Sequence, residues 1–348
     1  MFIPILSRTY LISLYNGGKK MGKTIVISDV HMSNGVDSYT WFKTPLEDKF
    51  YRFLSEILDD NSVSDIVIVG DLFDTWLYPI DVVPFTYSQI ISKYNKIASV
   101  IKNLVEKKNS VVYLKGNHDM TITDTDLDFF SSGGRKLQLT STKEFNLRHK
   151  NWHFEHGNDV DMFNAPDNSG DTLACLPLGY YVTRLIATAV DKHGDLSQYY
   201  AFVQDFKAGN FNENSSFFAD MITLLELAAD VTDCDKIRFS DDNDQKYTVG
   251  DIKKKYSTLL YRWWKRYPDN LLNTMLTALL NDGLQWYASL LTEEKKYSLI
   301  VMGHTHYPIE NGIYLNDGCW CYSTTGSNYH TSYVEIDADN AVVKNYNG

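Results

Sequence analysis

The sequence lacks features that mark several large classes of protein. Four cysteines in 348 residues are too few to hold a chain of this length together by disulfides. No run approaches the ~18 consecutive apolar residues that a membrane-spanning helix needs. Positive charge is also scarce: 33 Lys and Arg stand against 44 Asp and Glu, a net charge of −11. That balance argues against binding nucleic acid through a basic surface, and we expect a cytoplasmic protein with no transmembrane segment.

The first 22 residues also lack the pattern of a secretory signal. Their two short apolar runs, Phe2–Leu6 and Leu11–Tyr15, are separated by polar residues, and Lys19 and Lys20 follow them. A signal places its positive charge before an unbroken apolar region. We expect residues 1–22 to be an N-terminal extension.

What remains is the composition of a folded protein, with 44% hydrophobic and 22% charged residues. From Lys23 onward, β-branched apolar runs alternate with segments of helical spacing. The expected strands are 24–28, 66–69, 111–114, 145–154, 299–302, 313–315, 333–336 and 341–343, and the first two expected helices are 47–58 and 87–105. This order indicates βαβ units and a largely parallel sheet.

Residues 160–297 differ, because they show no such alternation. Their apolar spacing predicts helices at 179–190, 196–206, 217–229, 252–267 and 271–291. They also hold many of the aromatic residues that make up 14% of the chain, and we expect most of these rings to pack helix against helix. The chain is therefore expected to comprise an extension (1–22), a core in two parts (23–159 and 298–348) and a helical insertion (160–297).

Histidines and carboxylates gather directly after the expected strands. Five motifs carry them: DVH at 29–31, GDLFD at 70–74, GNHD at 116–119, HG at 156–157 and GHTH at 303–306. The carboxyl ends of strands in open α/β sheets form the crevice where ligands bind. A nitrogen and oxygen donor set without thiolate suits Mn²⁺, Fe or Zn²⁺ in a site with open positions. The donors exceed what one ion takes from protein, so we expect two ions sharing a carboxylate, an arrangement that clamps the attacking and leaving oxygens of a phosphoryl displacement.

The order of these motifs resembles that of the calcineurin-like metallophosphoesterase family, over about residues 23–159 and 298–348. The resemblance implies a four-layer αββα sandwich with residues 160–297 as a helical cap. It implies seven metal ligands: Asp29, His31 and His306 on the first ion, Asn117, His156 and His304 on the second, and Asp71 bridging both. It further implies a metal-bridging hydroxide as nucleophile, with His118 as general acid oriented by Asp119. Mn²⁺ is the expected metal, with Fe or Zn²⁺ as alternatives.

The substrate is less well specified. GDLFDTW and GHTHYP, together with a helical lid, are similar to UDP-2,3-diacylglucosamine pyrophosphohydrolases, but those enzymes typically have GNRD where this chain has GNHD, a shorter lid, and HGD rather than HGND. A phosphodiesterase or phosphatase acting on a small or lipid-linked phosphoester is the main expectation. The alternatives are a nucleotide or nucleotide-sugar pyrophosphohydrolase, a nuclease, which the acidic balance disfavours, and a non-catalytic metal-binding scaffold.

Two further expectations concern single residues. Arg184 and Arg262 of the insertion are candidate phosphate contacts, although solvated helix faces explain them equally well. Cys319 and Cys321 lie two apart in an expected strand, and we expect buried, reduced thiols there. The sequence leaves the oligomeric state open.

Overall fold

The computed structural model describes residues 22–140, 151–167, 176–194, 217–240, 247–280, 283–322, 329–338 and 340–348. Residues 1–21 of the expected extension and the expected helix at 196–206 lie outside these ranges. No helix within them is long and apolar enough to cross a membrane.

A six-stranded mixed sheet carries the first three motifs. Its strand order is β10 (Asn340–Asn345), β9 (Ser332–Asp337), β1 (Lys23–Ile27), β2 (Val63–Val69), β3 (Ser110–Leu114) and β4 (Gln138–Thr140). Strands β1 to β4 are parallel, whereas β9 and β10 pair antiparallel at one edge. β1 and β3 are buried along almost their whole length, as expected for apolar strands covered on both faces.

A second, four-stranded sheet carries the last two motifs. Its order is β5 (Trp152–Glu155), β6 (Leu299–Met302), β8 (Tyr314–Asp317) and β7 (Pro308–Asn311). β5, β6 and β8 are parallel, and β7 is an antiparallel edge strand. Each sheet therefore aligns the carboxyl ends of its parallel strands.

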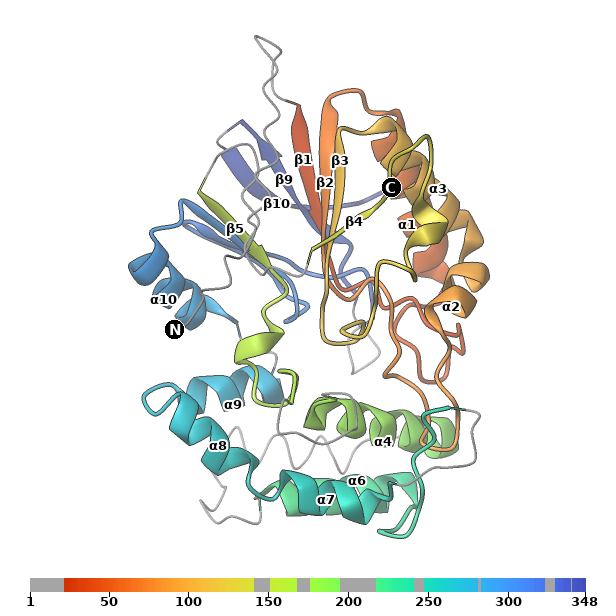
Figure 1. Cartoon of the computed structure of the whole chain (residues 1–348), viewed down its shortest axis with the longest axis vertical. Helices are drawn as coiled ribbons and strands as arrows, with labels where there is room; N and C mark the ends of the chain where they lie inside the picture. Colours follow the sequence, from red (N-terminus) through yellow and green to blue (C-terminus); the bar gives the residue numbers. More distant parts are fainter. Residues whose placement is uncertain are drawn as a thin grey trace, which may run out of the picture.

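The two sheets pack face to face between helices. Val26, Val67 and Val112 of the first sheet share a buried cluster with Phe154 and Val301 of the second. The opposite face of the first sheet is covered by α1 (Thr44–Asp59), α2 (Tyr87–Lys93) and α3 (Asn95–Lys107). The opposite face of the second sheet packs on α10 (Gln285–Lys295). These layers give the expected αββα sandwich (Figure 1).

The remaining described helices gather at one end of the sandwich, below the sheets in Figure 1. They are α4 (Leu178–His193), α6 (Phe217–Ala229), α7 (Val249–Tyr256), α8 (Leu259–Arg266) and α9 (Leu271–Leu280). Tyr180, Tyr181, Tyr256 and Trp263 are buried in the core of this helical part, as expected of its aromatic residues, and Trp76 from the loop after β2 joins them.

The structure corrects several expected boundaries. The helix expected at 87–105 is two helices separated at Tyr94, and those expected at 252–267 and 271–291 are each interrupted as well. α10 falls inside the expected insertion 160–297 but packs on the second sheet, so the end of that range belongs to the sandwich. Cys319 and Cys321 are buried and free, as predicted, but they lie after the end of β8 at Asp317 and not in a strand.

Candidate metal centre and active site

Sharp turns at the strand ends bring the motif residues together. Eight described non-glycine residues have left-handed backbone, and five of them are candidate ligands: Asp29, His31, Asp71, His304 and His306, with φ of 51° to 73°. Such a conformation costs a non-glycine residue about 1–3 kcal/mol and persists only where the surroundings impose it. The strain in the described backbone is therefore concentrated at this site.

Two glycines allow the turns to approach one another. A Cβ at Gly116 would lie 2.1 Å from Asp71 Oδ1, and one at Gly303 would lie 2.5 Å from Asp29 Oδ2. Either contact is closer than atoms can approach, so any side chain at these positions would displace a candidate ligand. This explains why GNHD and GHTH both begin with glycine.

Three of the candidate ligands form a first cluster. Nε2 of His31 lies 3.1 Å from Nε2 of His306. Oδ1 of Asp29 lies 3.2 Å from Nε2 of His306 and 3.7 Å from Nε2 of His31. Three donor atoms thus converge on one point, and they belong to the three residues that the family resemblance implies for a first ion.

A second cluster lies beside the first. Nε2 of His156 lies 3.0 Å from Oδ1 of Asn117 and 3.1 Å from Oδ2 of Asp71. The same Oδ2 is 3.9 Å from Nε2 of His31. Asp71 therefore lies between the two clusters, where a bridging carboxylate is expected.

His304 reaches the site differently. Its backbone N–H donates to Asp29 Oδ2 at 2.8 Å, and its ring centroid is 5.1 Å from that of His156. Its Nε2 is 2.8 Å from Asp161 Oδ2, so Nδ1 is the nitrogen left for a metal.

A cation fits this arrangement. The Asp29 carboxylate is fully buried, and no donor among the described residues makes a well-aligned hydrogen bond to its Oδ1. The two Nε2 atoms of His31 and His306 face each other at 3.1 Å. Buried carboxylate oxygens and converging imidazole nitrogens are the donor set of a borderline divalent metal.

The outer nitrogen of each candidate histidine is also engaged. The four contacts are His31 Nδ1 with Asp74 Oδ2 at 3.0 Å, His156 Nδ1 with the Val69 carbonyl at 2.8 Å, His306 Nδ1 with Cys321 Sγ at 3.6 Å, and His304 Nε2 with Asp161 Oδ2 at 2.8 Å. Such partners fix the tautomer and orientation of metal-binding imidazoles. The sequence alone assigns Asp161 and Cys321 no role at this site, because only the fold brings them behind the rings.

Charges within the site oppose the effect of burial. Burial alone would raise the pKa of Asp29, but His156 and His306 hold it well below its usual range. Burial would lower the pKa of His156, but Asp71 and Asp29 raise it to about 10. Without metal, the His156 proton therefore supplies positive charge between the two carboxylates.

His118 is oriented by a different carboxylate from the one expected. Its Nδ1 lies 3.0 Å from Asp74 Oδ1, and its ring stacks on Trp76 at 4.4 Å. Asp119 instead accepts hydrogen bonds from the Gly116 backbone N–H at 2.7 Å and from the Tyr113 hydroxyl. The prediction that Asp119 orients His118 is therefore wrong. Asp74, the last residue of GDLFD, takes that place.

Asp119 is fully buried behind the GNHD loop. Burial, together with the nearby Asp71 carboxylate, raises the pKa of Asp119 to about 7. Its hydrogen bonds fix the loop that presents Asn117 and His118, so its contribution is to the shape of the site.

Arg184 is not available as a phosphate contact. It is fully buried on α4, and its guanidinium donates to the Tyr180 hydroxyl and to backbone carbonyls of Tyr78, Pro79, Ile80, Val82 and Arg238. It holds the helical part against the loop that follows the second motif. Arg262, whose side chain is one-third exposed, pairs with Asp167 at 2.9 Å.

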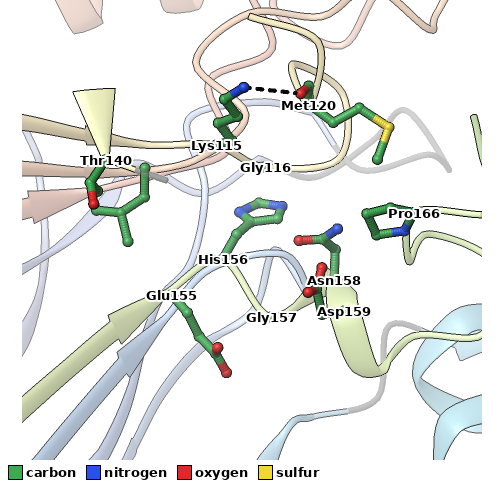
Figure 2. A pocket seen from close by; sticks show the side chains of 11 residues that line it. Lys115, Gly116, Met120, Thr140, Glu155, His156, Gly157, Asn158, Asp159 and Pro166 are labelled. Atoms are coloured by element: carbon green, nitrogen blue, oxygen red, sulfur yellow. Dashed lines mark hydrogen bonds between the residues drawn. The ribbon is translucent and has the colours of Figure 1, made fainter. Parts of the chain in front are cut away.

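A pocket of about 230 Å³ lies against the second cluster. Figure 2 shows it between the loop at 115–120 and the loop at 155–159, with the His156 ring between them. Gly116 and His156 line it, and its other polar lining residues are Lys115, Thr140, Glu155, Asn158 and Asp159. The pocket therefore adjoins the candidate metal ligands of the second cluster.

Of the comparisons with known proteins, the family model is the one that bears on this geometry. No curated protein matches the chain. Among solved structures, GAP50, the anchor in the inner membrane complex of Plasmodium, is 12% identical with a TM-score of 0.33, over 94% of this chain and 84% of that one. The model of the calcineurin-like phosphoesterase family matches residues 22–308, a range that includes all five motifs. The chain belongs to the calcineurin-like phosphoesterase family and is a metal-dependent hydrolase of phosphoric esters.

Proposed function

We propose that the protein is a two-metal phosphoester hydrolase. Asp29, His31 and His306 would hold the first ion, Asn117, His156 and His304 the second, and Asp71 both. The observation that carries the proposal is the position of Asp71 Oδ2, 3.1 Å from His156 of one cluster and 3.9 Å from His31 of the other. The second ion's third ligand would be Nδ1 of His304, whose ring Asp161 holds.

The metal ions would supply the nucleophile and neutralise charge, but not the proton for the leaving group. When bound, two divalent ions supply a nucleophilic water of lowered pKa and neutralise charge on the phosphoryl oxygens. Mn²⁺ suits the mixed carboxylate, amide and imidazole donors, and Fe or Zn²⁺ remain alternatives.

His118 is proposed as the general acid. Because its Nδ1 faces Asp74, Nε2 is the nitrogen that donates a proton to the leaving oxygen. Asp74 lies 3.0 Å from the other ring nitrogen, and the stacked Trp76 fixes the ring plane. As the P–O bond to the leaving group breaks, the proton moves from Nε2 to that oxygen and releases an alcohol. General-acid assistance of this kind contributes about 10²–10⁴-fold.

The substrate is proposed to be a small or lipid-linked phosphodiester or pyrophosphate. The pocket beside His156 offers room for a second substituent on phosphorus, which a monoester lacks. The free cysteines at 234, 319 and 321 are compatible with the proposed reducing, cytoplasmic location.

The test is hydrolysis of bis-p-nitrophenyl phosphate by the full chain with added Mn²⁺. We expect turnover that chelation abolishes, that Asp71→Asn loses together with bound metal, and that His118→Ala lowers without loss of metal. His193→Ala is the matched control, because His193 is exposed at the end of α4. Full activity in both Asp71→Asn and His118→Ala would overturn the assignment. Failure to turn over any mono-, di- or pyrophosphate ester would favour a binding scaffold.

A further inference from the structure

Trp41 lies beside three histidines of the site, although it is outside the five sequence motifs. Its ring centroid is 4.8 Å from that of His31, 5.5 Å from that of His118 and 5.6 Å from that of His306. The first and last contacts are edge-to-face, and the ring is tilted by 53° against His118. Trp41 therefore forms a wall of the catalytic centre.

The ligand that Trp41 contacts edge-to-face at 5.6 Å, His306, is also the candidate ligand most exposed to solvent. Asp29, His31 and Asp71 are at most 1% exposed, whereas the His306 side chain, the least buried of the candidate ligands, is 13% exposed. Trp41 is itself only half-buried. A substrate that approaches the ligands from the His306 side therefore passes the Trp41 ring.

Contacts with the rest of the fold fix the position of the Trp41 ring. The Trp41 carbonyl accepts a hydrogen bond from the Tyr322 N–H at 3.0 Å. Its ring packs against the buried cluster of Tyr39, Leu77 and Ala187, the last on α4. An aromatic ring held in this way can bind a ligand at little cost in conformational entropy.

Two tryptophans flank His118, but only one can reach a substrate. Trp76 stacks on His118 and is 1% exposed, because the helical part covers it. Trp41 contacts the same histidine at 5.5 Å and is half-buried. The group that receives a proton from His118 must lie next to its Nε2, and of these two tryptophans Trp41 is the half-buried one beside that histidine.

We infer that Trp41 contacts the leaving group and selects phosphoesters of alcohols that carry a flat aromatic or heteroaromatic ring. The inference rests on the proposed function, since it uses His118 as the proton donor. Offset or edge-to-face packing of two aromatic rings contributes about two- to twelve-fold beyond the area that they bury. We therefore expect a preference of this size over a saturated ring of similar volume.

The experiment compares benzyl phosphate with cyclohexylmethyl phosphate, and dibenzyl phosphate with its bis(cyclohexylmethyl) counterpart, using the Mn²⁺-loaded full chain. Both leaving groups are primary alcohols, so they differ chiefly in the flatness of the ring. Calorimetric Kd values for benzylphosphonate and cyclohexylmethylphosphonate give a readout independent of turnover. The variants are Trp41→Phe, which keeps a ring, Trp41→Leu, which keeps apolar volume against Tyr39 and Leu77, and Trp41→Ala.

We expect wild type and Trp41→Phe to favour the aromatic member by about two- to twelve-fold in kcat/KM and in Kd, and Trp41→Leu and Trp41→Ala to lose that preference. The matched control is Trp264→Ala, because Trp264 is 51% exposed on α8, and it should keep the preference. If Trp41→Ala fails to fold, Trp41→Leu decides.

Two outcomes separate this inference from the proposed function. Turnover of both esters with no ring preference, or a preference that survives Trp41→Leu, would overturn the inference and leave the hydrolase intact. Absence of turnover of every ester would overturn the proposed function. Equal phosphonate affinities in wild type and Trp41→Leu would then overturn the inference as well.

Discussion

Asp74 connects metal binding to proton transfer, because its two carboxylate oxygens contact different histidines. Oδ2 lies 3.0 Å from His31 Nδ1, and Oδ1 lies 3.0 Å from His118 Nδ1. Oδ1 also accepts backbone N–H bonds from Trp76 at 2.8 Å and Leu77 at 2.9 Å. Burial alone would raise the pKa of Asp74, but His118 and His31 hold it far below the usual range, so the group is a carboxylate at neutral pH.

Asp74→Asn removes this charge without changing the size of the side chain. The amide oxygen can still accept from Trp76 and Leu77, but the amide nitrogen then faces His31 Nδ1. For His31 to offer Nε2 to a metal, Nδ1 must carry the proton, and an amide N–H₂ cannot accept it. We therefore expect metal affinity at this site to fall about 10- to 100-fold.

At saturating metal, the remaining effect of Asp74→Asn is a loss of catalytic rate through His118. Its imidazolium has lost a paired charge, so we expect kcat for an ester of a weakly acidic alcohol to fall about 10²-fold, at the lower end of general-acid effects. An ester of p-nitrophenol, whose leaving group needs little protonation, should lose much less.

The assay is steady-state hydrolysis of the two ester types across a Mn²⁺ titration, with Asp74→Ala as a second variant. Because Ala leaves two buried N–H groups without acceptors, at about 1–3 kcal/mol each, its free energy of unfolding should be about 2–6 kcal/mol lower than that of Asp74→Asn. Equal losses for both leaving groups in Asp74→Asn, or no loss, would refute the role given to Asp74.

Three further predictions concern the surroundings of the site. In the metal-free protein the His156 pKa is raised from 6.5 to about 10, so the bound proton stabilises the fold fully below pH 6.5, and this stabilisation is lost as pH rises through about 10. Because Mn²⁺ must displace the His156 proton, we expect the apparent Mn²⁺ affinity to rise with pH and proton release on binding at pH 7.5. Calorimetry in buffers of different ionisation enthalpy measures this release, and its absence would contradict the prediction. Asp161→Ala should weaken metal binding about 10- to 100-fold by freeing the His304 ring, and unchanged stoichiometry and affinity would show that Asp161 has no such role. Arg184→Met should lower the free energy of unfolding by at least ~3 kcal/mol, since it leaves several buried carbonyls unpaired, and a loss under ~1 kcal/mol in urea unfolding would contradict the contacts described for it.

Runs of apolar residues in the sequence predict the buried strands of this fold. Leu299–Met302 is apolar throughout, and the expected strand coincides with β6. The apolar pattern of the sequence does not predict β4 and β7. Gln138–Thr140 is only half-buried and Pro308–Asn311 is half-buried to exposed, so neither segment has the apolar residues of a core strand. The break at Tyr94 also lies inside an uninterrupted helical pattern.

The site could be located from the sequence because its residues follow strands directly. The roles of Asp74, Asp161 and Trp41 depend on distances between loops that are remote in the chain, which no local pattern contains. The Asp74 position was visible in GDLFD, but the sequence shows no reason for His118 to face it rather than its neighbour Asp119. Arginine side chains are rarely fully buried. Arg184 is an exception, because backbone carbonyls of one loop accept hydrogen bonds from its guanidinium.

The most direct test of the two-metal hydrolase is metal content measured together with turnover on the same sample of the full chain. We predict two equivalents of divalent metal per chain after Mn²⁺ loading, with hydrolysis of bis-p-nitrophenyl phosphate that chelation removes and Mn²⁺ restores, and loss of both metal and activity in Asp71→Asn. A folded protein that binds no divalent metal, or that keeps full activity after chelation, would contradict the account.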